Sequence, residues 1–250
     1  LTPPAWDHGI DPAAIRAGGF FGRAWRDVAS LAAMFTALRR AVGGVLDAPA
    51  LPAGVTGHGF IRPAAAAERP PPLAAGLAAV LEALTVEDAS LTYRAIRLAS
   101  PAGLGSSGQH DVMDEPTVTL LEAMRAASGR DLIARQYATG YADVFGIGVP
   151  QLRACRAAGW SEPWATSATY LAFLAAFPDT HVARKHGADR AAAVQQRAIG
   201  LHARLQAASN PALLHDPLLD FDRELKMGGI NPGTSADLTV ASHFAAALLA

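Results

Sequence analysis

Apolar residues recur every three or four positions along most of the chain, which is the spacing of amphipathic helices. Alanine is abundant and runs of β-branched residues are scarce, and both features favour helices over strands. The sequence contains no convincing alternating segment and no internal repeat. The pattern therefore predicts an all-α protein, a single domain over residues 1–250 built as a bundle of about nine or ten helices.

Proline, glycine and capping residues separate the predicted helices. Thr85 and Asp88 have the spacing of a capping box, which indicates a helix start. Thr234 or Ser235 is expected to cap the last helix, with Asp237 at the position of a second box. The helices are expected at about residues 25–42, 73–84, 85–99, 116–127, 130–145, 149–158, 162–177, 188–208 and 217–226, with a last one ending at 250.

The N-terminal part, residues 1–72, is rich in loops outside its one predicted helix. Residues 45–72 carry many prolines and glycines and have the character of a long loop or lid. A loop of this length in a compact domain is either functional or disordered.

Composition excludes several classes of protein. The net charge is −1 with mixed signs, so the chain carries no electrostatic footprint for nucleic acid. No apolar run approaches the roughly 20 residues of a membrane span, and no signal peptide is visible. The single cysteine, Cys155, cannot pair within the chain, which suits a reducing compartment. We expect a cytoplasmic protein that binds neither nucleic acid nor membrane. Its oligomeric state stays open, a homo-oligomer included.

The stretch Asp179–Gly187, DTHVARKHG, concentrates polar groups in a sequence with only 17% charged residues. It places Arg184, Lys185 and His186 close to a carboxylate. Arginine binds phosphate oxygens in a planar, bidentate manner, and lysine adds a compact point charge. The stretch predicts a site for a polyphosphate and its metal ion. The alternative is a solvated connection between two helices.

Residues 228–237 form a second polar stretch, in which a tight turn leads into the last helix. A glycine-rich turn before a helix presents free N–H groups and the positive end of the helix dipole, which suits a phosphate group. The alternative is simply a well-capped helix start, and Asp237 could instead be a metal ligand. The expected phosphate-binding residues are Asn231, Gly233, Thr234 and Ser235.

Residues 101–115 form a third polar stretch, with glycines and serines followed by carboxylates. Glycine permits close approach of the backbone to phosphate, and Mg²⁺ takes a few carboxylates together with phosphate oxygens. Asp111 and Asp114 would share one face if the segment were helical, and we expect them to bind Mg²⁺. The alternative is a glycine loop with an acidic helix start. The expected phosphate-binding residues are Gly103, Gly105 and Ser106.

Taken together, these stretches resemble the triphosphoribosyl-dephospho-CoA synthase family, the CitG/MdcB-like proteins. The similar segments are residues 100–105 with 111–114, residues 179–187 and residues 231–237. Segments similar to the divergent, archaeal-type branch are Glu87-Asp88, residues 93–97 and residues 138–141. The resemblance covers about residues 73–250, and residues 1–72 are divergent.

The resemblance implies an all-helical transferase that moves a 5-triphosphoribosyl group from ATP to the 2′-hydroxyl of 3′-dephospho-CoA and releases adenine, in prosthetic-group synthesis. Mg²⁺ is the expected cofactor. His181 is the expected general acid–base, because an imidazole changes charge near neutral pH. We also expect Asp179→Asn to abolish turnover without unfolding the protein. The candidate catalytic carboxylates or Mg²⁺ ligands are Asp111, Asp114, Asp179 and Asp237.

The sequence departs from the family pattern in its N-terminal part. It shows no Pro-Lys-Pro-Gly segment, and the family's Asn-Thr-His-x-Gly-type segment has no clear counterpart, with Gly57-His58-Gly59 standing where we would expect it. Two other hypotheses therefore stay open. One is a related ATP-dependent transferase with another acceptor, in a one-carbon pterin cofactor pathway. The other is a nucleotide-binding homologue without activity.

Overall fold

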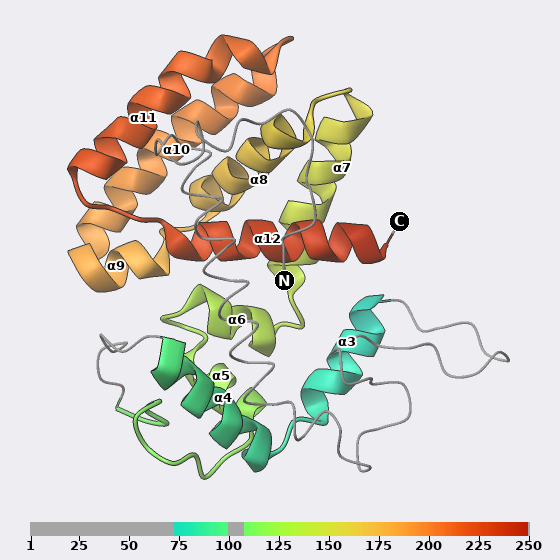
Figure 1. Ribbon diagram of the computed structural model, residues 1–250, viewed down its shortest axis with the longest axis vertical. Helices are drawn as coiled ribbons and strands as arrows, with labels where there is room; N and C mark the ends of the chain where they lie inside the picture. Colours follow the sequence, from blue (N-terminus) through green and yellow to red (C-terminus); the bar gives the residue numbers. More distant parts are fainter. Residues whose placement is uncertain (1–72, 100–107, 250) are drawn as a thin grey trace, which may run out of the picture. The chain divides into compact units, whose positions relative to one another are not determined.

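The computed structural model describes residues 73–99 and 108–249, which form helices joined by turns and loops, with no strand among them (Figure 1). The all-α prediction is confirmed. The predicted helix at 25–42 and the loop at 45–72 lie outside the described residues. The helices are α3 (Leu73–Glu82), α4 (Val86–Ala99), α5 (Leu120–Ala127), α6 (Leu132–Ala138), the π-helix η1 (Val144–Gly148), α7 (Val149–Ala157), α8 (Glu162–Ala176), α9 (Thr180–His186), α10 (Ala188–Ala207), the 3₁₀-helix η2 (Pro211–Leu214), α11 (His215–Met227) and α12 (Gly233–Leu248).

Contacts divide the chain into two compact units, one of residues 1–29 and 151–240 and the other of residues 30–150 and 241–250. We describe each unit by itself, and the single-domain organisation stays a prediction. Within the described ranges, none of the helices combines the length and apolar character that a membrane crossing requires.

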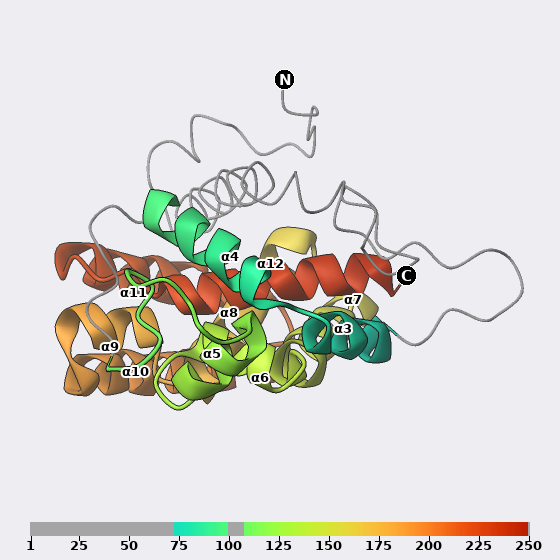
Figure 2. The same cartoon turned by 90° about the horizontal axis from the view of Figure 1, so that it is seen from below.

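The 151–240 unit is built around α10, which packs against α8, α9 and α11. The apolar stripe that the sequence predicts on α10 is buried, because residues three or four apart lie on one helix face. Leu171 and Leu174 on α8 are fully buried as well. In two perpendicular views α9 lies beside the first turns of α10 (Figure 1 and Figure 2). The buried residues of α10 are Ala191, Val194, Ala198, Leu201 and Leu205.

The 30–150 part of the second unit has its core between α4 and α5, with α6 packed on α5. Ala89 and Tyr93 of α4 meet Leu120 and Ala123 of α5 in this core. The buried Tyr93 hydroxyl donates a hydrogen bond of 2.9 Å to the carbonyl of His110. This bond ties the start of the acidic segment 110–115 to α4.

Two predicted helix starts have different outcomes. The Thr85 capping box is confirmed, since the Asp88 carboxylate accepts from the Thr85 N–H at 2.7 Å and the Thr85 hydroxyl accepts from the Asp88 N–H at 3.2 Å. The start predicted at Pro116 is wrong, because α5 begins at Leu120. Thr119 and Glu122 form a complete capping box there. A reciprocal cap satisfies two N–H groups, whereas proline only restricts φ.

The helix predicted at 130–145 is shorter than expected, and α6 ends at Ala138. Gly140 and Tyr141 both have a φ of 62°, which no right-handed helix can accommodate. The break predicted at Gly146 and Gly148 is also wrong, because a π-helical turn from Val144 leads directly into α7. Glycine lowers helix propensity by only about 1 kcal/mol, so packing overrides it here.

We expect Thr119→Ala to lower the stability of α5 by about 1 kcal/mol, because it removes the side chain that accepts the Glu122 N–H. Hydrogen exchange of the α5 amides measures this directly. Thr117→Ala is the matched control, since Thr117 is exposed and precedes the cap. Equal protection of α5 in both variants would contradict the prediction.

Candidate functional site

Asp179 is fully buried and begins α9. Its Oδ1 accepts from the N–H groups of His181 at 3.0 Å and Val182 at 3.1 Å. Both N–H groups belong to the first turn of α9 and have no partner within the helix. Asp179 is therefore the N-cap of α9, and aspartate is among the strongest residues for this role.

The other oxygen of the same carboxylate binds the start of α12. Asp179 Oδ2 accepts from the Ser235 N–H and from the Ser235 hydroxyl, both at 2.8 Å. The prediction that Thr234 or Ser235 caps α12 is wrong, because the helix already begins at Gly233 and Asp179 binds its first turn. One carboxylate thus holds two helix starts together with four hydrogen bonds.

Two threonines complete this connection. The Thr180 and Thr234 hydroxyls lie 3.1 Å apart, and the His181 N–H donates to the Thr234 hydroxyl at 3.3 Å. Thr234 and Ser235 are buried. We call Asp179, Thr180, His181, Thr234 and Ser235 the Asp179 junction. Its hydroxyls and amides bind one another, so α12 begins against protein rather than against an open anion site.

Within the Asp179 junction, the His181 ring is the group that remains available for chemistry. Its Nε2 is buried and has no hydrogen-bond partner among the described residues. Its Nδ1 lies 3.4 Å from the Arg184 guanidinium. Because arginine only donates, Nδ1 is the acceptor and the ring proton sits on Nε2. An unpaired buried polar atom is uncommon, and a catalytic role is one of its physical explanations, beside local strain or a bound water or ion.

The surroundings of His181 keep the ring neutral. Burial lowers the pKa of His181 below its ordinary 6.5, the positive charges of Lys185 and Arg184 lower it further, and Asp179 acts in the opposite direction. A Cβ at Gly233 would lie 3.5 Å from Nδ1 and 3.7 Å from the Asn231 side-chain nitrogen. Asn231 and Gly233 therefore lie together on the Nδ1 side of the His181 imidazole.

Arg184, Lys185 and His186 are exposed in the last turn of α9. No carboxylate among the described residues pairs with them. The C-terminal end of a helix carries partial negative charge, which favours cations there. Three unpaired cationic or protonatable groups follow a neutral imidazole within one short helix, an arrangement suited to a phosphorylated ligand.

Asp111 and Asp114 belong to the other unit and lie in a turn rather than a helix. The Asp114 N–H donates to the Asp111 carbonyl at 3.0 Å, and the Met113 N–H donates to Asp111 Oδ1 at 2.9 Å. Throughout the described part of the chain, no three His, Cys, Asp or Glu side chains gather as a metal site requires. Asp237 is half-buried in α12. Gly103, Gly105 and Ser106 lie outside the described residues.

The sequence analysis missed the role of Thr180, whose hydroxyl meets Thr234. The two threonines are 54 positions apart. No local signal indicates such a contact, because a threonine at a helix start is ordinary.

The fold and these side chains define an all-helical protein with a cationic helix end beside a half-buried imidazole whose pKa is lowered. The model of the CitG family, described as ATP:dephospho-CoA triphosphoribosyl transferase, matches residues 61–250. The chain therefore belongs to the CitG family.

One curated relative is a probable 2-(5''-triphosphoribosyl)-3'-dephosphocoenzyme-A synthase from Pseudomonas putida, 31% identical over 142 residues. The match covers 55% of this chain and 50% of the relative, so the chain spans about half the length of the protein it matches. No solved structure matches the chain with significance.

Proposed function

We propose that the chain transfers a 5-triphosphoribosyl group from ATP to the 2′-hydroxyl of 3′-dephospho-CoA. The C1′–N9 bond of ATP breaks, and a bond forms between C1′ and the acceptor oxygen. The acceptor hydroxyl loses a proton, and adenine leaves with one. Family membership supports the reaction class. Within the described residues, the observation that supports the assignment to particular residues is the His181 imidazole, whose Nε2 has no partner. It lies in one helix with Arg184, Lys185 and His186, which no described carboxylate pairs with.

In this proposal Arg184, Lys185 and His186 bind the triphosphate. Arginine suits the oxygens because its guanidinium is planar and bidentate. Arg184 also contacts His181 Nδ1, so its movement to a phosphate would free that nitrogen. Asn231 and Gly233 lie on the same side of the ring and would line the path of the ligand. Binding and proton transfer are therefore linked through one arginine.

His181 takes the proton of the attacking hydroxyl at Nδ1 in this mechanism. The lowered pKa keeps Nδ1 unprotonated at neutral pH, which a general base requires. A general base of this kind contributes roughly 10²–10⁴-fold to rate.

Asp179 has a positioning role rather than a catalytic one. Both of its oxygens face N–H or O–H donors, and the side chain is fully buried. A cation would have to replace these donors, so Asp179 does not suit a metal ligand. Instead it fixes the backbone of His181, to which its Oδ1 is bonded at 3.0 Å.

Mg²⁺ belongs to the proposal as the partner of the ATP triphosphate. Mg²⁺ in proteins is commonly held by one or two carboxylates together with phosphate oxygens and water. Asp111 and Asp114 in one unit and Asp237 in the other stay candidate carboxylates, each considered within its own unit. When bound, the ion would neutralise phosphate charge.

The test is adenine release from ATP and Mg²⁺, with and without dephospho-CoA, followed by mass spectrometry of the acceptor. We expect adenine only when dephospho-CoA is present, together with an adduct that carries the triphosphoribosyl group. Asp111→Asn and Asp114→Asn should raise the Mg²⁺ concentration needed for half-maximal rate, while Asp189→Asn, an exposed change on α10, should not.

Other outcomes separate the alternatives. Adenine release that requires a pterin precursor in place of dephospho-CoA would establish another acceptor. ATP binding without adenine release under either condition would identify a homologue without this activity. Absence of ATP binding would overturn the proposed site.

A further inference from the structure

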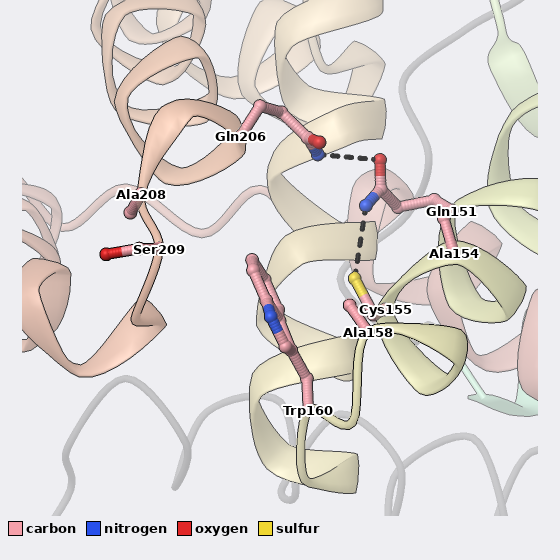
Figure 3. A pocket seen from close by; sticks show the side chains of 8 residues that line it. All are labelled: Gln151, Ala154, Cys155, Ala158, Trp160, Gln206, Ala208 and Ser209. Atoms are coloured by element: carbon pink, nitrogen blue, oxygen red, sulfur yellow. Dashed lines mark hydrogen bonds between the residues drawn. The ribbon is translucent and has the colours of Figure 1, made fainter.

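A polar pocket lies within the 151–240 unit, at the far end of α10 from α9. It is formed by α7, the residue Trp160 that follows it, and the last turn of α10 (Figure 3). Its volume is about 270 Å³. Ala188 and Gln206 are about 27 Å apart along α10 at the usual helical rise. The pocket is thus separate from the cations of α9. Its lining residues are Gln151, Ala154, Cys155, Ala158, Trp160, Gln206, Ala208 and Ser209.

The wall of the pocket carries a chain of hydrogen bonds. Gln206 Nε2 donates to Gln151 Oε1 at 2.9 Å, and Gln151 Nε2 donates to the Cys155 sulfur at 3.2 Å. Gln206 Nε2 also lies 3.2 Å from His202 Nε2. Burial lowers the pKa of His202, so its ring is neutral and can accept this bond. These contacts orient two carboxamides side by side at the pocket.

The remaining walls are flat and uncharged. Trp160 is half-buried, and Figure 3 shows its indole below the two carboxamides, between the Ala208–Ser209 segment and Cys155. Ala154, Ala158 and Ala208 leave room because their side chains are short. None of the eight lining residues is charged, so the pocket does not suit a phosphate group.

We infer that this pocket binds a planar nitrogen heteroaromatic ring of the nucleobase class. An indole face stacks on such rings, and Gln206 Oε1, whose own Nε2 already donates within the wall, can accept from an exocyclic amino group. The volume lies just below the roughly 300–1,000 Å³ of sites for drug-sized ligands, which limits the ligand to one or two fused rings. The inference does not depend on the transferase proposal.

Cys155 provides a reporter for this pocket, because it is the only cysteine of the chain. It is buried, and burial raises the pKa of its thiol. Iodoacetamide should therefore label it slowly. Adenine is the probe ligand, and we expect saturating adenine to slow the labelling about fivefold or more. Inorganic tripolyphosphate should leave the labelling rate unchanged, because its charge suits the cations of α9 instead.

Substitutions of the lining residues test whether adenine binds in this pocket. Trp160→Leu should weaken adenine binding by roughly tenfold or more in calorimetry, since stacking on an aromatic side chain dominates such sites. Gln206→Leu should weaken it as well. Gln196→Leu is the matched control, since Gln196 is an exposed residue of the same helix outside the pocket. Circular dichroism establishes that each variant is folded.

Three results would overturn the inference. The first is unchanged Cys155 labelling at adenine concentrations up to its solubility limit. The second is adenine binding that survives Trp160→Leu and Gln206→Leu but is lost in Arg184→Ala, which would place the ring at α9. The third is equal weakening by Gln196→Leu. Failure of adenine release from ATP would instead bear only on the transferase proposal.

Discussion

Replacing Asp179 with alanine is expected to lower the free energy of unfolding of the 151–240 unit by about 4 kcal/mol. The substitution removes the acceptor of the Val182 N–H and of the Ser235 N–H and hydroxyl, and it leaves the His181 N–H with only its bond to Thr234. Each buried donor left unpaired costs about 1–3 kcal/mol, and partial relaxation reduces the sum. Denaturant unfolding followed by circular dichroism measures the loss.

The isosteric substitution Asp179→Asn changes the expectation drawn from the sequence. Asparagine keeps one acceptor oxygen but turns an NH₂ group toward one pair of donors. We therefore expect it to destabilise the unit by about 2 kcal/mol instead of abolishing turnover in an intact fold. Asp189→Ala, at an exposed position of α10, is the control. A stability of Asp179→Ala equal to that of this control would show that the junction does not hold the two helix starts.

His181→Gln is expected to reduce kcat by roughly 10²–10⁴-fold while the protein stays folded. Glutamine retains the backbone N–H that Asp179 and Thr234 accept, so the junction survives. It removes the nitrogen that takes the proton. His215→Gln, at an exposed position of α11, should leave kcat unchanged. A His181→Gln enzyme with full activity would remove the imidazole from the mechanism.

The pH dependence of activity and of stability provides a second test of the role of His181. The pKa of His181 lies below 6.5, so the ring is a competent base at neutral pH and loses this ability as the pH falls through that lowered pKa. The unfolded chain, with an ordinary pKa of about 6.5, binds the proton more readily. Stability is therefore full above about pH 6.5 and decreases as the pH falls toward the folded-state pKa. In His181→Gln both the acid limb of kcat/KM and this part of the stability loss should disappear.

The local patterns of the sequence predicted most helices of the described chain, but they did not predict α9 and they misplaced the start of α5 and the end of α6. The stripe from Val194 to Leu205 predicted the buried face of α10, because periodicity along one helix decides which side is apolar. The capping box of Thr85 and Asp88 was visible for the same reason, since its partners are three positions apart. Where two local signals competed, as at Pro116 and Thr119, the reciprocal cap prevailed.

The sequence predicted which residue types are available for chemistry, but not how their side chains are arranged in space. The polar character of residues 179–187 follows from the sequence alone, and so does the suitability of Arg184 and Lys185 for phosphate. The sequence alone does not show which of these groups stabilises the fold and which is available for binding. Asp179 looked like a ligand for metal or substrate, whereas its oxygens bind two helix starts.

The sequence by itself determined the helical class, the helix faces and the residue types available for binding, because these depend on neighbours within one or two helical turns. Only the tertiary structure decided that Asp179 is a shared cap, that His181 keeps an unpaired nitrogen, and that two glutamines meet beside Trp160. The partners of Asp179 and Gln206 lie 56 and 55 positions away along the chain. These contacts join the start of α9 to α12 and α10 to α7, so they depend on how whole helices pack, and no local pattern specifies them.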